Sequence, residues 1–180
     1  MADDPRTADE LARRVHEACH LVGTFTLRSG RTATEYFDKY RFEADPLLLE
    51  QVANLMAPLV PPATDVLAGL EMGGIAIVAA LSRLTGLPAA FVRKQAKPYG
   101  TARLAEGADV AGRQVTVIED VVTSGGQIVL STSDLRALGA TVEVAVCAID
   151  REEGGADALA AEGIELRAAL TGDQLRAAAS

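Results

Sequence analysis

From residue 65 onward, short apolar runs alternate with segments that have the periodicity of a helix, and this alternation limits the fold more than any other feature. The apolar runs cover residues 66–68, 89–92, 115–118, 141–149 and 164–170, and the helical segments cover residues 75–84, 127–138 and 156–162. The pattern predicts an α/β fold with a central, mostly parallel sheet that is flanked by helices on both faces. Ligands of such sheets bind in the loops at the carboxyl ends of the strands.

The first 45 residues show a different pattern. A capping box at residues 7–10 predicts a helix that runs to about Val22, and short strands are expected at residues 24–27 and 35–37. Asp45 and Pro46 then mark the start of a second helix. The 180 residues suit a single domain, in which residues 1–45 form a small N-terminal hood and residues 46–180 form the core.

Composition excludes several classes of partner. The formal net charge of -8 argues against nucleic acid, because nonspecific binding needs a basic face. The longest apolar stretch, residues 75–81, is too short to span a membrane, and the acidic N-terminus does not resemble a signal peptide. Cys19 and Cys147 have no metal-ligand spacing, and both are expected to be buried thiols, although a disulfide stays open. A cytoplasmic location is therefore predicted.

The segment at residues 115–127 carries the strongest chemical signal. An apolar strand is expected to end at Glu119 and Asp120, and a loop of small and hydroxylated residues then opens a helix. Free backbone N–H groups and the positive end of the helix dipole make such a loop a phosphate site. Two carboxylates beside a phosphate would repel it unless they bind ribose hydroxyls, alone or with a divalent cation. No Lys follows the glycines, so this is not a Walker loop, and a dinucleotide fingerprint is absent.

This segment resembles the signature of type I phosphoribosyltransferases, which bind 5-phosphoribosyl-1-pyrophosphate (PRPP). The resemblance implies that Glu119 and Asp120 bind the ribose 2′- and 3′-hydroxyls and that residues 123–127 hold the 5′-phosphate. It implies PRPP contacts at Glu119, Asp120, Val121, Val122, Thr123, Ser124, Gly125, Gly126 and Gln127. The two carboxylates would also lie near the ribosyl carbon, where they would stabilise positive charge in the transition state.

A second loop, residues 93–107, contains the cations Arg93, Lys94 and Lys97 within five residues of an acidic chain. One interpretation is a solvated basic loop. The other is a mobile lid that closes over an anionic leaving group such as pyrophosphate.

Together the two loops resemble orotate phosphoribosyltransferases, whose lid reads Arg-Lys-x-x-Lys-x-His-Gly. Arg93, Lys94, Lys97 and Gly100 match this lid, whereas Tyr99 stands where many members have His. The resemblance implies that PRPP contacts Arg93, Lys94, Lys97 and Tyr99. It implies catalytic roles for Lys97, Asp120, Glu119 and Arg93. His16 and His20, both expected in the first helix, are assigned to the surface or an interface.

Weaker matches add further candidates. Arg28 stands in the family's Leu-Lys-Ser-Gly-Arg hairpin and would contact PRPP. Met72 and Gly73 lie in the turn expected to hold pyrophosphate, where many members carry a Lys at the position of Gly73. The resemblance implies that orotate contacts Tyr36, Phe37, Thr123 and Arg151. A core role for Phe37 and a surface role for Arg151 stay open.

The resemblance implies transfer of the phosphoribosyl group of PRPP to orotate, giving orotidine 5′-monophosphate and pyrophosphate in UMP biosynthesis. It implies Mg²⁺ held mainly by PRPP, with contact through Asp120 and water left open and no direct protein ligand assigned. It also implies a homodimer whose lid reaches the neighbouring site. Two alternatives remain: a phosphoribosyltransferase for another base, and a non-catalytic PRPP-binding regulator.

Overall fold

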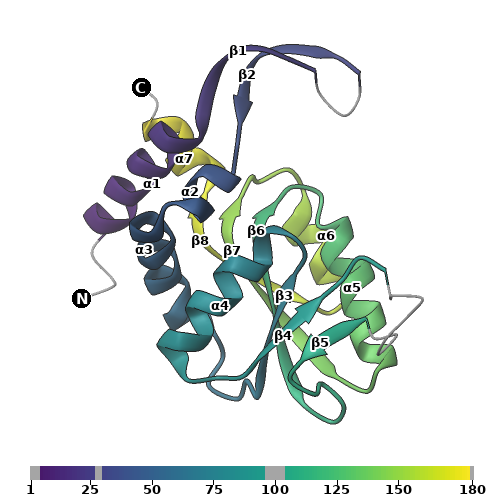
Figure 1. The fold of residues 1–180 in the computed structure, drawn as a ribbon. Coiled ribbons are helices and arrows are strands. Elements are labelled where there is room, and N and C mark those ends of the chain that lie inside the picture. Colours follow the sequence, from purple (N-terminus) through teal and green to yellow (C-terminus); the bar gives the residue numbers. More distant parts are fainter. Residues whose placement is uncertain (1–4, 27–29, 96–103, 179–180) are drawn as a thin grey trace.

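A six-stranded sheet forms the centre of the protein, and its strand order is β5-β4-β3-β6-β7-β8 (Figure 1). The computed structural model describes residues 5–26, 30–95 and 104–178. The strands of this sheet are β3 (Val66–Leu70), β4 (Ala89–Val92), β5 (Ala105–Gly107), β6 (Gln114–Val122), β7 (Thr141–Asp150) and β8 (Glu165–Thr171). All neighbours pair in parallel except β4 and β5, which are antiparallel. This confirms the predicted fold class.

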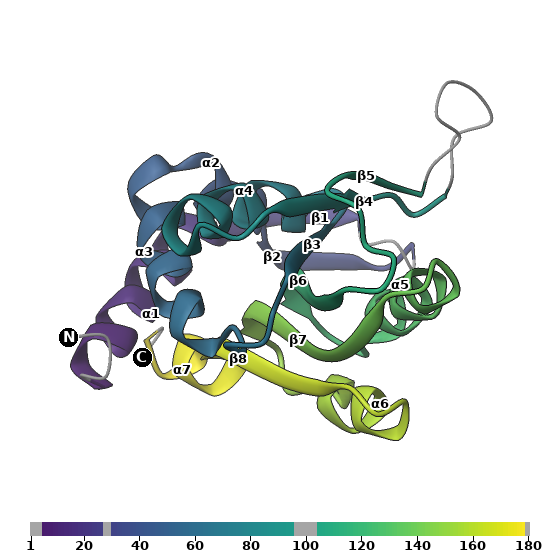
Figure 2. The ribbon, with the colours of Figure 1, turned by 90° about the horizontal axis from the view of Figure 1, so that it is seen from below.

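Helices cover both faces of the sheet (Figure 2). One face packs against α1 (Pro5–Cys19), α3 (Pro46–Met56), α4 (Gly73–Thr85) and α7 (Gly172–Ala178), with the short η1 (Ala57–Leu59) after α3. The other face packs against α5 (Gly126–Ala137) and α6 (Gly155–Ala161). Each face has its own apolar core, because successive residues of a strand point to opposite sides.

Strand β6 shows this alternation clearly. Ile118 is buried in the core beneath α4, whereas Val117 is buried in the core beneath α5. The apolar run that predicted this strand covers residues 115–118 and the two acids were expected to end it, but β6 continues to Val122, so Glu119 and Asp120 lie within it. The prediction was too short because the long β7 strand supplies hydrogen-bonding partners up to the Val122–Asp150 pair.

The N-terminal segment forms a two-stranded antiparallel hairpin of β1 (His20–Thr26) and β2 (Thr32–Phe37), which extends away from the body of the protein (Figure 1). The first helix ends at Cys19 and not near Val22 as expected, so His20 belongs to the hairpin. Pairing with β2 overrides the helical pattern of these residues, and the Asp38 backbone N–H donates to the Cys19 carbonyl at 2.9 Å.

Three short elements were not expected from the sequence, namely α2 (Tyr40–Ala44), β5 and α7. Each has seven residues or fewer, which is too short for a periodic pattern to stand out. Both cysteines are buried, as predicted, and both are free thiols. Within the described part of the chain, no helix is long and apolar enough to cross a membrane.

The start of α3 provides a test of the helix signals. Asp45 accepts hydrogen bonds from the N–H groups of Leu47 and Leu48 at 2.9 and 3.1 Å, and Pro46 occupies the first turn. We expect Asp45→Ala to lower the free energy of unfolding by about 1 kcal/mol, because two amide donors lose their acceptor. The melting temperature should fall by about 2–4 °C.

Glu50→Ala is the matched control, because Glu50 is exposed on the same helix. Its effect on the free energy of unfolding should stay within about 0.5 kcal/mol. Equal losses in the two variants would contradict the capping role of Asp45.

Candidate functional site

Four loops that carry candidate residues meet at one edge of the sheet. Strands β4, β3, β6 and β7 are parallel neighbours in that order, so their carboxyl ends lie side by side. Arg93 follows β4, the turn with Met72 and Gly73 follows β3, and Arg151 follows β7. The loop at residues 123–125 follows β6, in the middle of this row. The fold therefore brings the core candidates together at the predicted edge.

The loop after β6 forms a small pocket of about 190 Å³ at the start of α5. Glu119 and residues 121–128 line it, and Thr123 and Ser124 are exposed at its rim. Gly125 precedes the helix in a left-handed conformation with φ of 74°. A helix start with free N–H groups and a small, open loop is suited to hold a phosphate group.

The shape of this loop depends on close packing with α6. A Cβ atom on Gly155 would lie 2.5 Å from the Thr123 carbonyl oxygen and 2.6 Å from a methyl group of Val122. The first residue of α6 therefore has to be glycine for the loop to keep its path. The tertiary packing, and not the loop sequence alone, fixes the position of the predicted phosphate site.

Asp120 points away from this pocket, toward α4 and the N-terminal segment. Its side chain is 1% exposed, and Oδ2 lies 2.5 Å from the Nζ atom of Lys39. Its Oδ1 atom accepts a hydrogen bond from the Val121 N–H at 2.5 Å. A Cβ atom on Gly73 would lie 1.6 Å from Oδ2, so the carboxylate rests directly against the backbone of the turn after β3.

A further carboxyl group, that of Glu43 in α2, lies in this environment. Burial, followed by the charge of Asp120, raises the pKa of Glu43 to about 8. Its Oε1 atom is buried and has no hydrogen-bond partner among the described residues. Lys39 opposes the shift, because its positive charge favours the ionised carboxyl group.

The two adjacent acids of β6 differ in ionisation. Burial, and then the charge of Asp120, raise the pKa of Glu119 well above its usual range. Burial also opposes ionisation of Asp120, but its contacts with Glu119 and Lys39 outweigh burial and lower the pKa of Asp120. For Lys39, burial is likewise outweighed by Asp120, and its pKa is raised. Asp120 and Lys39 therefore form the ion pair of this cluster.

The turn after β3 is tied to the start of the predicted lid. The Lys94 N–H donates to the Glu71 carboxylate at 2.6 Å, and the Glu71 N–H donates to the Val92 carbonyl at 2.8 Å. Met72 is 63% exposed at the tip of this turn. Arg93 is partly buried, and its Nε atom has no hydrogen-bond partner within the described residues. Arg28, Lys97 and Tyr99 lie outside the described residues.

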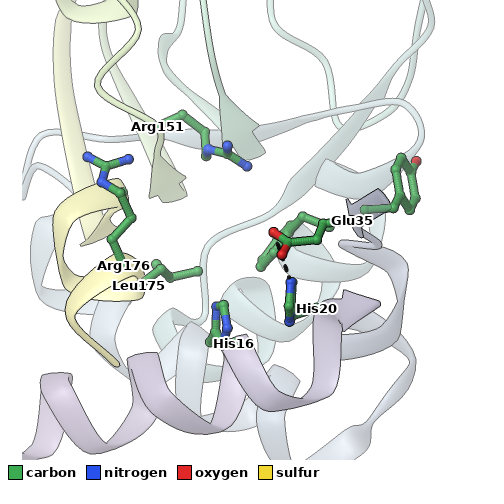
Figure 3. A pocket seen from close by; sticks show the side chains of 9 residues that line it. His16, His20, Glu35, Arg151, Leu175 and Arg176 are labelled. Carbon is green, nitrogen blue, oxygen red and sulfur yellow. Dashed lines mark ion pairs between the residues drawn. The ribbon is translucent and has the colours of Figure 1, made fainter. Parts of the chain in front are cut away.

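A larger cavity of about 730 Å³ lies between the hairpin and the carboxyl ends of β7 and β8 (Figure 3). Its lining includes Tyr36, Phe37 and Arg151, three of the four candidates for orotate contacts. The Arg151 guanidinium carbon lies 5.9 Å from the centre of the Phe37 ring. Thr123, the fourth candidate, lines the smaller pocket instead.

The same cavity contains residues that sequence reasoning placed on the surface or did not consider, namely His16, His20, Glu35, Gly172, Leu175 and Arg176. The rings of His16 and His20 stack with their centres 4.8 Å apart, and His20 Nε2 lies 3.4 Å from a Glu35 carboxylate oxygen. Lys39 and Glu43 were missed as well. None of these residues belongs to a motif, so only the folded chain reveals them.

Known proteins of similar sequence are orotate phosphoribosyltransferases. The chain is 58% identical over 168 residues to an orotate phosphoribosyltransferase of Nocardioides sp., which covers 93% of this chain and 94% of that protein. It is 42% identical to the orotate phosphoribosyltransferase of Methanocella arvoryzae, over 85% of this chain and 87% of that protein. No model of a protein family matches the chain.

Among solved structures, a similar fold occurs in orotate phosphoribosyltransferase of Mycobacterium tuberculosis H37Rv in complex with PRPP. The TM-score is 0.81 at 29% sequence identity, and the match covers 94% of this chain and 99% of that chain.

Contact between Gly73 and Asp120 predicts the effect of a side chain at position 73. We expect Gly73→Ala to lower the free energy of unfolding by about 1–3 kcal/mol, because the new methyl group must displace a buried carboxylate from its ion pair. Gly126→Ala is the control, since its methyl group would meet no atom nearer than 3.9 Å. Chemical denaturation of both variants measures the difference, and equal stabilities would contradict the contact.

The raised pKa of Glu43 predicts a pH dependence of stability. A carboxyl group that folding makes harder to ionise contributes most to stability when it is protonated in both states. This contribution falls as the pH rises from 4.5, the ordinary value for this group, to about 8. Glu43→Gln lacks this loss, so its stability relative to the unsubstituted protein should increase across that range. Denaturation curves at several pH values test this, and a difference independent of pH would refute it.

Proposed function

The chain belongs to the orotate phosphoribosyltransferase family and transfers the phosphoribosyl group of PRPP to orotate, and we propose that the reaction takes place at the edge formed by β4, β3, β6 and β7. The observation that carries this assignment is the phosphate-sized pocket of Glu119 and residues 121–128 at the start of α5. The products are orotidine 5′-monophosphate and pyrophosphate.

The 5′-phosphate of PRPP is proposed to bind in this pocket. The start of α5 supplies N–H groups and a positive dipole end, and Thr123 and Ser124 supply exposed hydroxyl groups. The ribose would then lie over the end of β6. Glu119 would face it from the pocket side, and Asp120 from the side of the turn with Gly73.

Pyrophosphate is proposed to lie over the ends of β3 and β4. Backbone N–H groups of the turn with Met72 and Gly73 would bind its oxygens, and Arg93 and Lys94 would add positive charge from the start of the lid. The Lys94–Glu71 hydrogen bond supports this arrangement, because it holds the lid start beside the turn. Lys97, Tyr99 and Arg28 stay predicted PRPP contacts.

Orotate is proposed to bind on the opposite side of the ribose, in the cavity lined by Tyr36, Phe37 and Arg151. The guanidinium group of Arg151 can pair with the orotate carboxylate through two N–H donors. The Phe37 ring beside it offers a face for the planar base. A contact from Thr123 to orotate stays a prediction.

In the reaction, the bond between the ribosyl C1′ and the pyrophosphate oxygen breaks as a bond from an orotate nitrogen to C1′ forms. Positive charge develops on the ribosyl ring, and the fixed negative charge of Asp120, near the end of β6, would stabilise this charge. The cations of the lid would stabilise negative charge on the departing pyrophosphate. Orotate enters as an anion, so the nitrogen needs little activation by a base.

Mg²⁺ dependence is part of the proposal. The described residues contain no cluster of three or more His, Cys, Asp and Glu side chains that could hold a metal ion. The buried carboxylate of Asp120 suits a Mg²⁺ ion that takes most of its oxygen ligands from PRPP and contacts the protein through water, because Mg²⁺ usually keeps several waters and binds substrate phosphates. The ion would neutralise charge on pyrophosphate.

A homodimer with a lid that acts in the neighbouring site stays a prediction, as do the cytoplasmic location and the division into a hood and a core. The cavity beside the hairpin would make the hood part of the base site.

An orotate assay tests the proposed site. With PRPP and Mg²⁺ present, the protein should consume orotate, whereas adenine, hypoxanthine and uracil should not replace it. Asp120→Asn and Arg151→Ala should each lower kcat/KM by about 100-fold, because each removes a charge aimed at the reacting groups. Their effects should separate, with Arg151→Ala raising the KM for orotate, and Asp120→Asn lowering kcat and raising the KM for PRPP.

Arg83→Ala is the control, since Arg83 lies in the last turn of α4, far from the carboxyl ends of the strands. Full activity of the Asp120→Asn and Arg151→Ala variants would rule out the proposed site while leaving the family assignment in place.

Removal of Mg²⁺ with a chelator should abolish turnover, and addition of Mg²⁺ should restore it. Turnover without any divalent ion would refute the metal dependence.

A further inference from the structure

Lys39 has no role in the function proposed so far, yet it makes the closest charged contact of the site. It lies in the short link between β2 and α2, 81 residues before Asp120 in the sequence. Its ammonium group lies 2.5 Å from Asp120 Oδ2, with 34% of the lysine side chain exposed and 1% of the aspartate side chain. The ion pair therefore bridges the N-terminal segment and the buried acid of β6.

The surroundings of Asp120 leave few ways to orient its carboxylate. Gly73 blocks one side, because even a methyl group there would overlap Oδ2. The Val121 N–H binds Oδ1 within the strand. Lys39 contacts Oδ2 from a further side, and its ammonium group also lies over the Tyr40 ring, 5.4 Å from the ring centre.

Charge in this cluster also depends on Lys39. The carboxyl groups of Glu43, Glu119 and Asp120 lie close together here. The positive charge of Lys39 acts to lower the pKa of each of them. A buried carboxylate without a cation is strongly disfavoured. Removal of the ammonium group would leave Asp120 among two acidic neighbours in a site that must accept the anionic PRPP.

The position of Gly73 strengthens this argument. Without a side chain, Gly73 leaves room for the Asp120 carboxylate to rest against the turn. Lys39 brings an ammonium group to the same carboxylate from a different part of the chain. The carboxylate is therefore held between the turn after β3 and the link before α2.

We propose that Lys39 is a positioning residue for the reaction, which holds Asp120 against the turn after β3 so that PRPP meets a fixed carboxylate. The inference rests on the proposed function, because it needs Asp120 to face the ribose. Lys39 acts through Asp120, and not on orotate, so its loss should affect PRPP and leave binding of the base unchanged.

The test uses Lys39→Met, Lys39→Arg and Asp120→Asn, together with the double variant Lys39→Met/Asp120→Asn. Lys39→Met should raise the KM for PRPP about tenfold and leave the KM for orotate within about twofold. Lys39→Arg should recover most of the affinity, because a guanidinium group can also pair with a carboxylate. Calorimetric titration with PRPP and Mg²⁺ gives an independent dissociation constant.

The double variant separates positioning from a general structural role. A neutral Asn at position 120 no longer needs the ammonium group, so the double variant should be no worse than Asp120→Asn alone. Additive losses, or an unchanged KM for PRPP in Lys39→Met, would overturn the inference. Arg41→Met is the control, because it removes an exposed cation from α2, two residues after Lys39.

Two outcomes keep this test distinct from the test of the function. If the unsubstituted protein turns over orotate and Lys39→Met does so with the same KM for PRPP, only the role of Lys39 fails. If the unsubstituted protein binds no PRPP, the proposed site fails first. Should Lys39→Met not fold, Lys39→Gln keeps a hydrogen-bond donor beside Asp120 and gives the same comparison.

Discussion

Successive residues of a β-strand point to opposite faces of the sheet, and at the end of β6 this constraint separates two neighbouring carboxylates. Glu119 follows Val117 toward α5 and lines the phosphate-sized pocket, whereas Asp120 follows Ile118 toward α4 and meets Lys39 and the turn with Gly73. Because the strand continues through both acids, their side chains leave it on opposite faces. The pairing of β6 with β7 as far as Val122 therefore decides which partner each acid has.

The separation of the acids also gives them different charges. Asp120 is held as the ionised member by Lys39, while burial and its neighbour favour a proton on Glu119. A pair of adjacent acids thus provides one fixed negative charge and one group that burial favours in its protonated form. This division suits a site that must bind an anionic substrate and still stabilise positive charge on its ribose ring.

The N-terminal segment takes part in the site although it lies outside the main sheet. The link after β2 supplies Lys39, the hairpin supplies Phe37 beside Arg151, and α2 supplies Glu43. Phe42, fully buried in the core beneath α4, anchors α2 in this position. The packing of the N-terminal segment against the core therefore sets the electrostatics around Asp120.

The sequence by itself determined the layered α/β fold, the acidic strand end, the small-residue loop before α5 and the family, because periodicity and motifs are local and survive without coordinates. It also placed Arg93, Gly73 and Arg151 at one edge, since parallel strands align their carboxyl ends. Only the tertiary structure decided that Lys39 pairs with Asp120, that Glu43 joins them, and that His16 and His20 share a cavity with Phe37. These contacts join residues from different elements, and no local pattern encodes the distance between side chains that meet only when the elements pack.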